Sequence, residues 1–317
     1  MIVTITLNPA IDKTTSVEAM LPDKKLRCST VTTEAGGGGI NVSKALKKLG
    51  AESTAIFLSG GNNGKLLEKY LEEQGISTLA IPIEGETRES FTVNEERTHA
   101  QYRFVLSGPD IQPGVADSCL RELDNIHPAP KYVVVSGSLP PGISETFFSD
   151  VAAWCKKAGA RCIVDSSGPA LQHAVQQGVF LIKPNLNELC LLSGKKNLQI
   201  NEVDDVALEL VRQGNIKVIV VSLGPSGALL VTADGYEHIP APMVKKNTTV
   251  GAGDSMVAGM VWQLSRDNNL EDVVRYGVAC GSAATMNQGT QLFDPKDVER
   301  LYKWIVKSSH HYKLNLD

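Results

Sequence analysis

The chain has few cysteines, and they lack the spacings at which cysteines act together. The six, at positions 28, 119, 155, 162, 190 and 280, form no C-x-x-C pair and no compact framework. In a chain of 317 residues, isolated thiols of this kind are typical of a reduced, cytoplasmic protein. The six histidines show no H-x-x-x-H spacing, so no zinc site is expected.

The chain also lacks an excess of positive charge and a long apolar segment. Its formal net charge of −4 argues against a nucleic-acid-binding surface, because such surfaces are basic. No apolar run approaches the roughly 18 residues that span a membrane. The first residues carry no basic region and soon reach Asp12 and Lys13, so we expect a first strand there and not a signal peptide.

Two familiar nucleotide-binding motifs are missing as well. Residues 60–65 superficially resemble a P-loop, but Ser59 replaces its first glycine and Leu66 its hydroxyl residue. The glycine run at 36–39 does not fit G-x-G-x-x-G, because no glycine follows at the last position. A P-loop or Rossmann mechanism is therefore not expected.

What the sequence does contain is an alternation of short apolar runs and amphipathic stretches. This alternation predicts an α/β fold with a largely parallel sheet covered on both faces, whose ligands gather at the C-terminal strand ends. The predicted strands are 2–7, 53–58, 132–136, 161–165, 179–182 and 217–222, and the predicted helices are 41–49, 64–74, 144–158, 185–193, 202–213, 254–265, 270–287 and 295–307.

Two segments, 14–34 and 88–106, interrupt the alternation with shorter and more polar strand-like stretches. We interpret them as antiparallel excursions from the main sheet. No low-complexity tract, internal repeat or linker divides the chain, so we expect a single domain, 1–317, that carries both excursions.

The most informative residues are 248–254, Thr-Thr-Val-Gly-Ala-Gly-Asp, which precede an apolar pattern of helical period. Asp254 should therefore lie at a helix N-terminus, where free N–H groups and the helix dipole favour an anion. A carboxylate there can accept the proton of an incoming hydroxyl. A tight turn with an Asp cap is the alternative, because Asp is a preferred N-cap residue.

A second glycine-rich element, residues 36–39 followed by Ile40 and Asn41, also leads into a predicted helix, which ends at Gly50. Two glycine-rich helix entries in one chain are harder to explain as simple turns. An anion cradle together with a base is an arrangement suited to phosphoryl transfer.

These two elements resemble the signatures of the ribokinase-like sugar kinases, the pfkB family. Residues 6–12, Thr-Leu-Asn-Pro-Ala-Ile-Asp, resemble the subgroup that phosphorylates sugars already carrying a phosphate. Further segments are similar to the 6-phosphofructokinases of this family, and the resemblance extends over about residues 1–307. Those segments are 25–28, 101–105, 136–142, 163–168 and 281–290.

The resemblance implies a ribokinase-like three-layer α/β/α sandwich with a mainly parallel central sheet and a small antiparallel β lid. The implied reaction is ATP-dependent phosphorylation of the C1 hydroxyl of fructose 6-phosphate, giving fructose 1,6-bisphosphate in glycolysis. Asp254 would be the general base, and the main chain at Gly251, Ala252, Gly253 and Asp254 would form the anion hole. The implied partners are ATP, Mg²⁺ and a second copy of the chain, joined through the lids; a tetramer is left open, and no nucleic acid or membrane is expected.

For the sugar, the resemblance implies one set of residues for the hydroxyls and another for the phosphate. A carboxylate suits adjacent hydroxyls, and the planar fork of arginine suits phosphate. Any single arginine could be a solvated lid residue, but three on the two lid segments favour a phosphate site. The hydroxyl set is Asp12, Gly37, Gly38, Gly39 and Asn41, and the phosphate set is Lys25, Arg27, Arg88, Arg103 and Ser138.

Residues 183–188, Lys-Pro-Asn-Leu-Asn-Glu, follow a predicted strand and open a helix, so Asn185 and Glu188 face the same way. Helix capping is the alternative that the residues leave open. The resemblance implies that both organise Mg²⁺, Glu188 through water, since Mg²⁺ keeps much of its water shell. The implied ATP contacts are Lys183, Asn185, Ser222, Gly224, Gly227 and Asn287, of which residues 222–227 form a turn between two strands.

One position departs from the family pattern D-T-x-G-A-G-D, because Thr248 stands where relatives have an acidic residue. That carboxylate helps hold a monovalent cation in relatives, so a need for K⁺ stays open. The oxygens that could still bind K⁺ belong to Thr248, Val250, Ala284, Asn287 and Gly289.

Other functions remain open at this level. Tagatose-6-phosphate kinase differs only in the C4 epimer of its substrate, and 1-phosphofructokinase adds phosphate at the opposite end of the sugar. A non-catalytic sugar-phosphate sensor should have lost Asp254, Asn185 or Glu188, yet all are present. A nucleoside kinase would need an apolar or aromatic pocket in place of the lid arginines.

Overall fold

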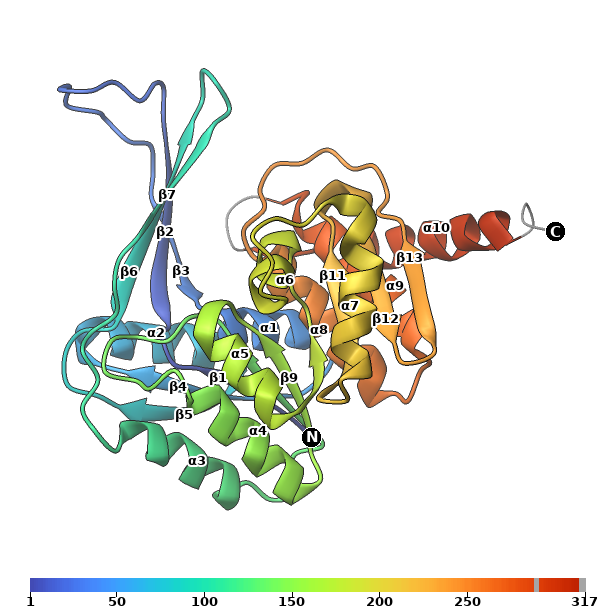
Figure 1. Cartoon of the computed structure of the whole chain (residues 1–317). Coiled ribbons are helices and arrows are strands. Elements are labelled where there is room, and N and C mark those ends of the chain that lie inside the picture. The colour runs from blue at the N-terminus through green and yellow to red at the C-terminus, as the bar shows by residue number, and fades with distance from the viewer. Residues whose placement is uncertain (288–290, 314–317) are drawn as a thin grey trace.

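The computed structural model describes residues 1–287 and 291–313, with side chains as far as residue 308 (Figure 1). Within that part of the chain, nine strands form the main sheet. Their order is β13 (Gly235–Ile239), β12 (Ala228–Thr232), β11 (Ile216–Ser222), β10 (Val179–Ile182), β9 (Arg161–Asp165), β8 (Tyr132–Ser136), β1 (Ile2–Thr6), β4 (Thr54–Ser59) and β5 (Ser77–Pro82). The strands from β5 to β11 run parallel, whereas β12 pairs antiparallel with both β11 and the edge strand β13.

Helices cover both faces of this sheet, as the strand sequences require. Strand β8 alternates its side chains, with Val133 and Val135 packed on one face and Tyr132 and Val134 on the other. One layer contains α3 (Val115–Asn125), α4 (Phe147–Ala158), α5 (Gly168–Gln177), α6 (Leu186–Leu192) and α7 (Val203–Arg212). The other contains α1 (Gly38–Lys48), α2 (Gly61–Glu73), α8 (Ala252–Ser265), α9 (Leu270–Ala284) and α10 (Pro295–Lys313). The predicted α/β/α fold is confirmed.

A second, four-stranded sheet projects from one end of the body and forms the lid (Figure 1). Its order is β3 (Thr32–Gly36), β2 (Ala10–Val17), β6 (Arg88–Glu95) and β7 (Gln101–Val105). The predicted antiparallel pairing is correct for the two outer pairs and wrong for the central pair, because β2 and β6 are parallel. The reason is that β2 follows β1 and β6 follows β5, and these two strands leave the main sheet in the same direction.

Four elements were not predicted from the sequence: β5, β13, α3 and α5. Both strands lie at the two edges of the main sheet, where half-exposed residues interrupt the apolar pattern. Helix α3 buries only Cys119 and Leu123 of its eleven residues, so its apolar stripe is thin. The lid also begins earlier than predicted, at Ala10 instead of residue 14.

Candidate active site

The fold brings the two glycine-rich elements into direct contact. Asn41 on α1 donates a hydrogen bond from Nδ2 to Asp254 Oδ2 on α8, at 2.9 Å and across 213 positions of sequence. Helix α8 begins at Ala252, so Asp254 lies in its first turn, as the sequence predicts. Within the described residues, the amide oxygen of Asn41, Oδ1, is buried and has no hydrogen-bond partner. That oxygen is therefore free to accept a bond from a bound hydroxyl group.

The glycines at the start of α1 let this helix approach the ends of two central strands. A methyl carbon added to Gly39 would lie 2.7 Å from the carbonyl oxygen of Ile5 in β1. One added to Gly38 would lie 2.7 Å from the carbonyl carbon of Ser136 in β8. Both distances are shorter than a carbon side chain tolerates, so only glycine fits here. The helix entry consequently lies at the C-terminal edge of the sheet, the usual place for ligands.

Asp254 has the electrostatics of a base that works near neutral pH. Withdrawal from water raises the pKa of its carboxyl group to about 6, and the nearby Asp165 carboxylate adds to the rise. The bond from Asn41 and the charge of Lys183 act in the opposite direction on this pKa. A carboxylate tuned in this way can take a proton from a hydroxyl at pH 7.

A buried ion pair lies beside the predicted anion hole. Lys183 Nζ and Asp165 Oδ1 are 3.1 Å apart, with side chains 8% and 15% exposed. A methyl carbon added to Gly253 would lie 3.4 Å from that ammonium and 3.9 Å from Asp165 Oδ2. Sequence reasoning assigned Lys183 to ATP but missed Asp165, whose signal was a carboxylate at the end of a buried strand.

Asn185 and Glu188 form a helix cap, which was the alternative interpretation of these residues from the sequence. Glu188 N–H donates to Asn185 Oδ1 at 2.9 Å, and Asn185 N–H donates to Glu188 Oε2 at 2.8 Å, which makes a capping box on α6. Burial raises the pKa of Glu188. Asn185 also forms a β-bridge with Ser222, so two predicted ATP residues are adjacent. Each carboxylate and amide oxygen keeps a further lone pair for a ligand.

The turn after β11 has the predicted hairpin form. Residues Gly224–Ser226 make one 3₁₀ turn, and Leu223 N–H donates to the Gly227 carbonyl at 2.8 Å. Gly227 has a φ of 98°, and any side chain there would collide with the carbonyl of Ile239. The turn and the neighbouring Ser222 therefore present backbone groups at the same sheet edge.

Four of the predicted K⁺ residues lie where the segment before α8 meets the end of α9. Thr248 is buried, its hydroxyl accepts a bond from Val250 N–H at 3.1 Å, and its own N–H donates to the Thr285 carbonyl. Asn287 donates from Nδ2 to the Leu292 carbonyl at 2.8 Å. Ala284 ends α9 next to this group. Gly289, the remaining predicted member, lies outside the described residues.

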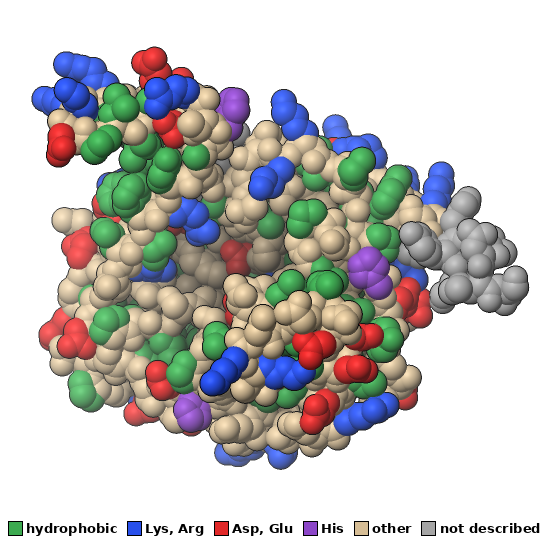
Figure 2. Space-filling view, turned by 45° about the horizontal axis from the view of Figure 1, so that its top comes forward, with side chains coloured by type: hydrophobic (Ala, Val, Ile, Leu, Met, Phe, Trp, Pro, Cys, Tyr) green, Lys and Arg blue, Asp and Glu red, His purple; other side chains and the backbone are tan. Residues whose placement is uncertain are grey.

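The sugar-phosphate candidates divide into two groups. Arg88 donates from Nε and Nη2 to the Asn8 carbonyl, at 3.2 and 3.0 Å, and from Nη1 to the Leu106 carbonyl at 3.1 Å. Asn8 in turn donates from Nδ2 to Ser138 Oγ at 3.1 Å. Arg88, Asn8 and Ser138 line a cavity of about 470 Å³. Figure 2 shows a hollow in the surface below the lid. The charges of Arg88 and Arg103 both lower the pKa of the Asp12 carboxylate.

Lys25 and Arg27, the second group, lie away from the cavity that Arg88 and Ser138 of the same chain line. Both are exposed in the connection between β2 and β3, at the tip of the lid. Figure 2 shows basic side chains gathered at that tip, away from the hollow. Their predicted role therefore requires either closure of the lid or a neighbouring copy.

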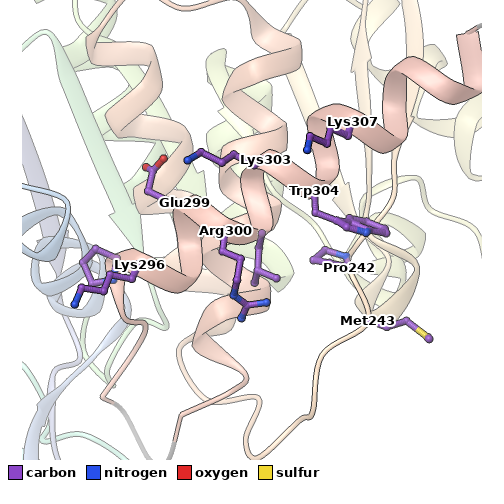
Figure 3. A pocket seen from close by; sticks show the side chains of 10 residues that line it. Pro242, Met243, Lys296, Glu299, Arg300, Lys303, Trp304 and Lys307 are labelled. Carbon is purple, nitrogen blue, oxygen red and sulfur yellow. The ribbon is translucent and has the colours of Figure 1, made fainter.

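A wider cavity, about 970 Å³, lies elsewhere. Its lining comes from α10 and the connection after β13, including Met243, Arg300, Lys303, Trp304 and Lys307 (Figure 3). Of the predicted site residues that the structure describes, none lines it. The chemistry therefore gathers at the strand ends and not in this cavity.

Comparison with known proteins decides the family. The model of the pfkB family carbohydrate kinases matches residues 1–297. The chain belongs to the pfkB family of carbohydrate kinases. This kinase is 43% identical to the ATP-dependent 6-phosphofructokinase isozyme 2 of Mycobacterium tuberculosis, over 95% of this chain and 89% of that protein. The isozyme 2 of Escherichia coli is 40% identical over 96% and 99%.

Relatives with other names are less similar to this pfkB-family kinase. A 1-phosphofructokinase of Bacillus subtilis is 33% identical over 92% of this chain and 96% of that protein. A tagatose-6-phosphate kinase of Staphylococcus epidermidis is 30% identical over 96% and 98%.

Among solved structures, phosphofructokinase-2 of Escherichia coli in complex with potassium superposes with a TM-score of 0.92, at 40% identity over 96% of this chain and 99% of that one. The same protein has been solved with fructose 6-phosphate and as a tetrameric inhibited form. The family predicted from the two glycine-rich elements is thus confirmed.

Proposed function

We propose that this pfkB-family kinase is an ATP-dependent 6-phosphofructokinase, which phosphorylates the C1 hydroxyl of fructose 6-phosphate. The observation that carries the proposal is the bond between Asn41 and Asp254, which joins a hydroxyl-binding group to a base. The names of the two relatives at 40% identity or more support the choice of substrate. Initial rates with ATP on competing sugar phosphates test it. In this proposal residues 1–317 act as a single kinase domain.

In the proposed reaction, Asp254 takes the C1 hydroxyl proton as the oxygen attacks the γ-phosphorus in line. The main-chain N–H groups at Gly251, Ala252 and Gly253, at the start of α8, stabilise the charge on the transferring group. Lys183, held beside Gly253 by Asp165, adds a positive charge at the same place. Protein groups therefore surround both the attacking oxygen and the transferred phosphoryl.

The residues around ATP fit Mg²⁺ and its waters, because they present oxygen atoms at one edge of the sheet. Asn185 and Glu188 cap the same helix, and the Asp165 carboxylate is close enough to Glu188 to raise its pKa. Bound Mg²⁺ would neutralise charge on the phosphate oxygens. Within the described residues no three His, Cys, Asp or Glu side chains cluster, so the ion would be held largely through water and ATP.

Glu188→Gln should raise the Mg²⁺ concentration needed for half-maximal activity more than it raises the KM for fructose 6-phosphate. The change removes a negative charge and keeps an oxygen for the capping bond to Asn185 N–H. A Mg²⁺ titration at saturating sugar phosphate measures the effect. Glu202→Gln is the matched control, because Glu202 caps the exposed helix Ile200–Glu202 in the same way. Equal titrations for wild type and both variants would leave Glu188 as a helix cap only.

A K⁺ ion is part of the proposal, although Thr248 replaces the acidic residue of other relatives. The hydroxyl of Thr248 and the neighbouring carbonyl groups offer neutral oxygens of the kind that K⁺ channels also use. The potassium complex of the Escherichia coli protein supports this assignment.

The assembly proposed is a homodimer joined through the lids. The lid exposes Val31, Phe104, Val105 and Leu106, and a small sheet that buries little surface is stable only when another element covers it. The tetrameric form of the Escherichia coli protein leaves a pair of dimers as an option.

In the part of the chain that the structure describes, no helix is long and apolar enough to cross a bilayer. We place the enzyme in the cytoplasm on the strength of its relatives and free thiols.

Mixing an Arg27→Ala subunit with an Asp254→Asn subunit should restore activity, because one site of each heterodimer would regain both groups. The position of Arg27 at the lid tip, away from its own chain's site, motivates the experiment. Tagged heterodimers are purified and their rate is compared with each parent homodimer. If light scattering shows that a fully active enzyme is a monomer, the proposed dimer is wrong. If purified heterodimers are inactive, only the proposal that the two subunits share an active site is wrong.

A further inference from the structure

Lys44 is a buried cation next to the sugar-binding side of the site. It lies on α1, is 6% exposed, and donates from Nζ to the Ala35 carbonyl at 2.8 Å. The next residue of β3 is Gly36, and any side chain there would collide with both carboxylate oxygens of Asp12. The ammonium of Lys44 and the carboxylate of Asp12 therefore lie against adjacent residues of one strand.

Several charged groups face Asp12 from the surrounding elements. Burial raises its pKa, Lys44 is the strongest of the three cations that lower it, and Arg88 and Arg103 are the other two. Glu34, its partner across β2 and β3, raises this pKa. Asp254 on α8 and Asp12 also repel each other. For Lys44, burial lowers the pKa, Glu34, Asp12 and Asp254 raise it, and the exposed Lys48 of the same helix lowers it.

Once substrate is bound, Arg88 and Arg103 no longer act on the charge of Asp12 alone. In the proposed function they bind the phosphate of the sugar. Its negative charge then offsets much of the positive charge that the two arginines present to Asp12. The phosphate also adds negative charge near Asp12. Lys44 does not belong to this phosphate-binding group, because its ammonium is buried and donates to the Ala35 carbonyl. It is therefore the cation left to balance Asp12 in the complex.

We propose that Lys44 is a positioning residue for sugar binding, which holds Asp12 as an ionised acceptor for the hydroxyl groups of the sugar phosphate. The inference rests on the proposed function and concerns the same site. A buried ammonium is costly unless negative charge lies near it, and the carboxylates of Glu34, Asp12 and Asp254 supply that charge.

The test is the KM for fructose 6-phosphate as a function of pH in Lys44→Met, whose side chain resembles the lysine stem. Asp12 must be ionised to accept two hydroxyls, so KM rises as pH falls through its pKa. Removing a neighbouring positive charge raises a carboxyl pKa by about 1–3 units. We expect the rise in KM to begin at least about one pH unit higher in Lys44→Met than in wild type. The KM for ATP should change less than about threefold over the same range.

Three further variants separate charge from packing. Lys44→Arg keeps the charge and should restore the wild-type profile. Lys48→Met removes an exposed lysine of the same helix and should leave the profile unchanged. In an Asp12→Asn background, Lys44→Met should cause no further shift. Titration of the substrate phosphate is common to all of them and cancels in the comparison.

Parallel KM profiles for wild type and Lys44→Met would overturn the inference, and so would a shift that persists in the Asp12→Asn background. Circular dichroism establishes that each variant is folded, and Lys44→Gln replaces Lys44→Met if the latter is not. If neither neutral variant folds while Lys44→Arg does, Lys44 serves the fold and the inference is overturned. A wild-type enzyme inactive on fructose 6-phosphate would instead overturn the proposed function.

Discussion

Asp254→Asn should lower kcat by about 10²–10⁴-fold, the usual value of general-base catalysis, with KM values for ATP and fructose 6-phosphate within a few-fold of wild type. The substitution keeps the shape of the side chain and an oxygen that can accept the bond from Asn41. Only basicity is removed. Rates at saturating substrates measure the effect, and Asp267→Asn is the control, since Asp267 follows the same helix and is 75% exposed.

The pH dependence of kcat/KM in the wild type is a second test of Asp254 as the base. Because the pKa of Asp254 is about 6 and its ionised form is the active one, kcat/KM should fall as pH drops through 6 and level off above 7. The folded state favours protonation of this group, so its ionisation costs stability as pH rises. The Asn variant should therefore melt no lower than wild type at pH 8. A loss of kcat below tenfold would exclude Asp254 as the base.

Arg88→Ala should lower kcat/KM for fructose 6-phosphate by about 10- to 150-fold, because a charge-assisted bond to phosphate contributes on the order of 1.5–3 kcal/mol. Its bonds to the Asn8 and Leu106 carbonyls use one N–H each from Nε, Nη1 and Nη2. The two remaining N–H groups stay available to a ligand in the cavity that Arg88 lines.

The bonds to the Asn8 carbonyl also tie the lid to the body, so the experiment must separate anchoring from recognition. Residual rates on unphosphorylated fructose provide that separation, because fructose needs the lid but has no phosphate. Arg97→Ala is the control, as Arg97 lies in the turn between β6 and β7 and is 61% exposed. Equal losses on both sugars would assign Arg88 to lid support.

The sequence was sufficient to predict that Asp254 and Asn41 lie at helix starts, because each helix entry is a local pattern with its own physical signature. Asp254 precedes an apolar helix, and Asn41 follows four glycines, so both were expected at helix entries. Their hydrogen bond across 213 positions was not predicted, since local patterns say nothing about which helices pack together. The alternation of strands and helices likewise predicted the layers of the fold.

Other features depend on position in three dimensions and left little trace in the sequence. Lys44 lies within an amphipathic helix that also carries Lys47 and Lys48, and nothing local indicates that it alone is buried. Asp165 resembles any polar residue that ends a strand. The parallel pairing of β2 and β6 depends on strand order in the main sheet, which short-range patterns do not encode.

The most direct test of the proposed function is a comparison of kcat/KM with MgATP on fructose 6-phosphate, tagatose 6-phosphate and fructose 1-phosphate. We expect the highest value on fructose 6-phosphate, with fructose 1,6-bisphosphate as the product. A higher value on either of the other two sugar phosphates, or no turnover of any of the three, would contradict it.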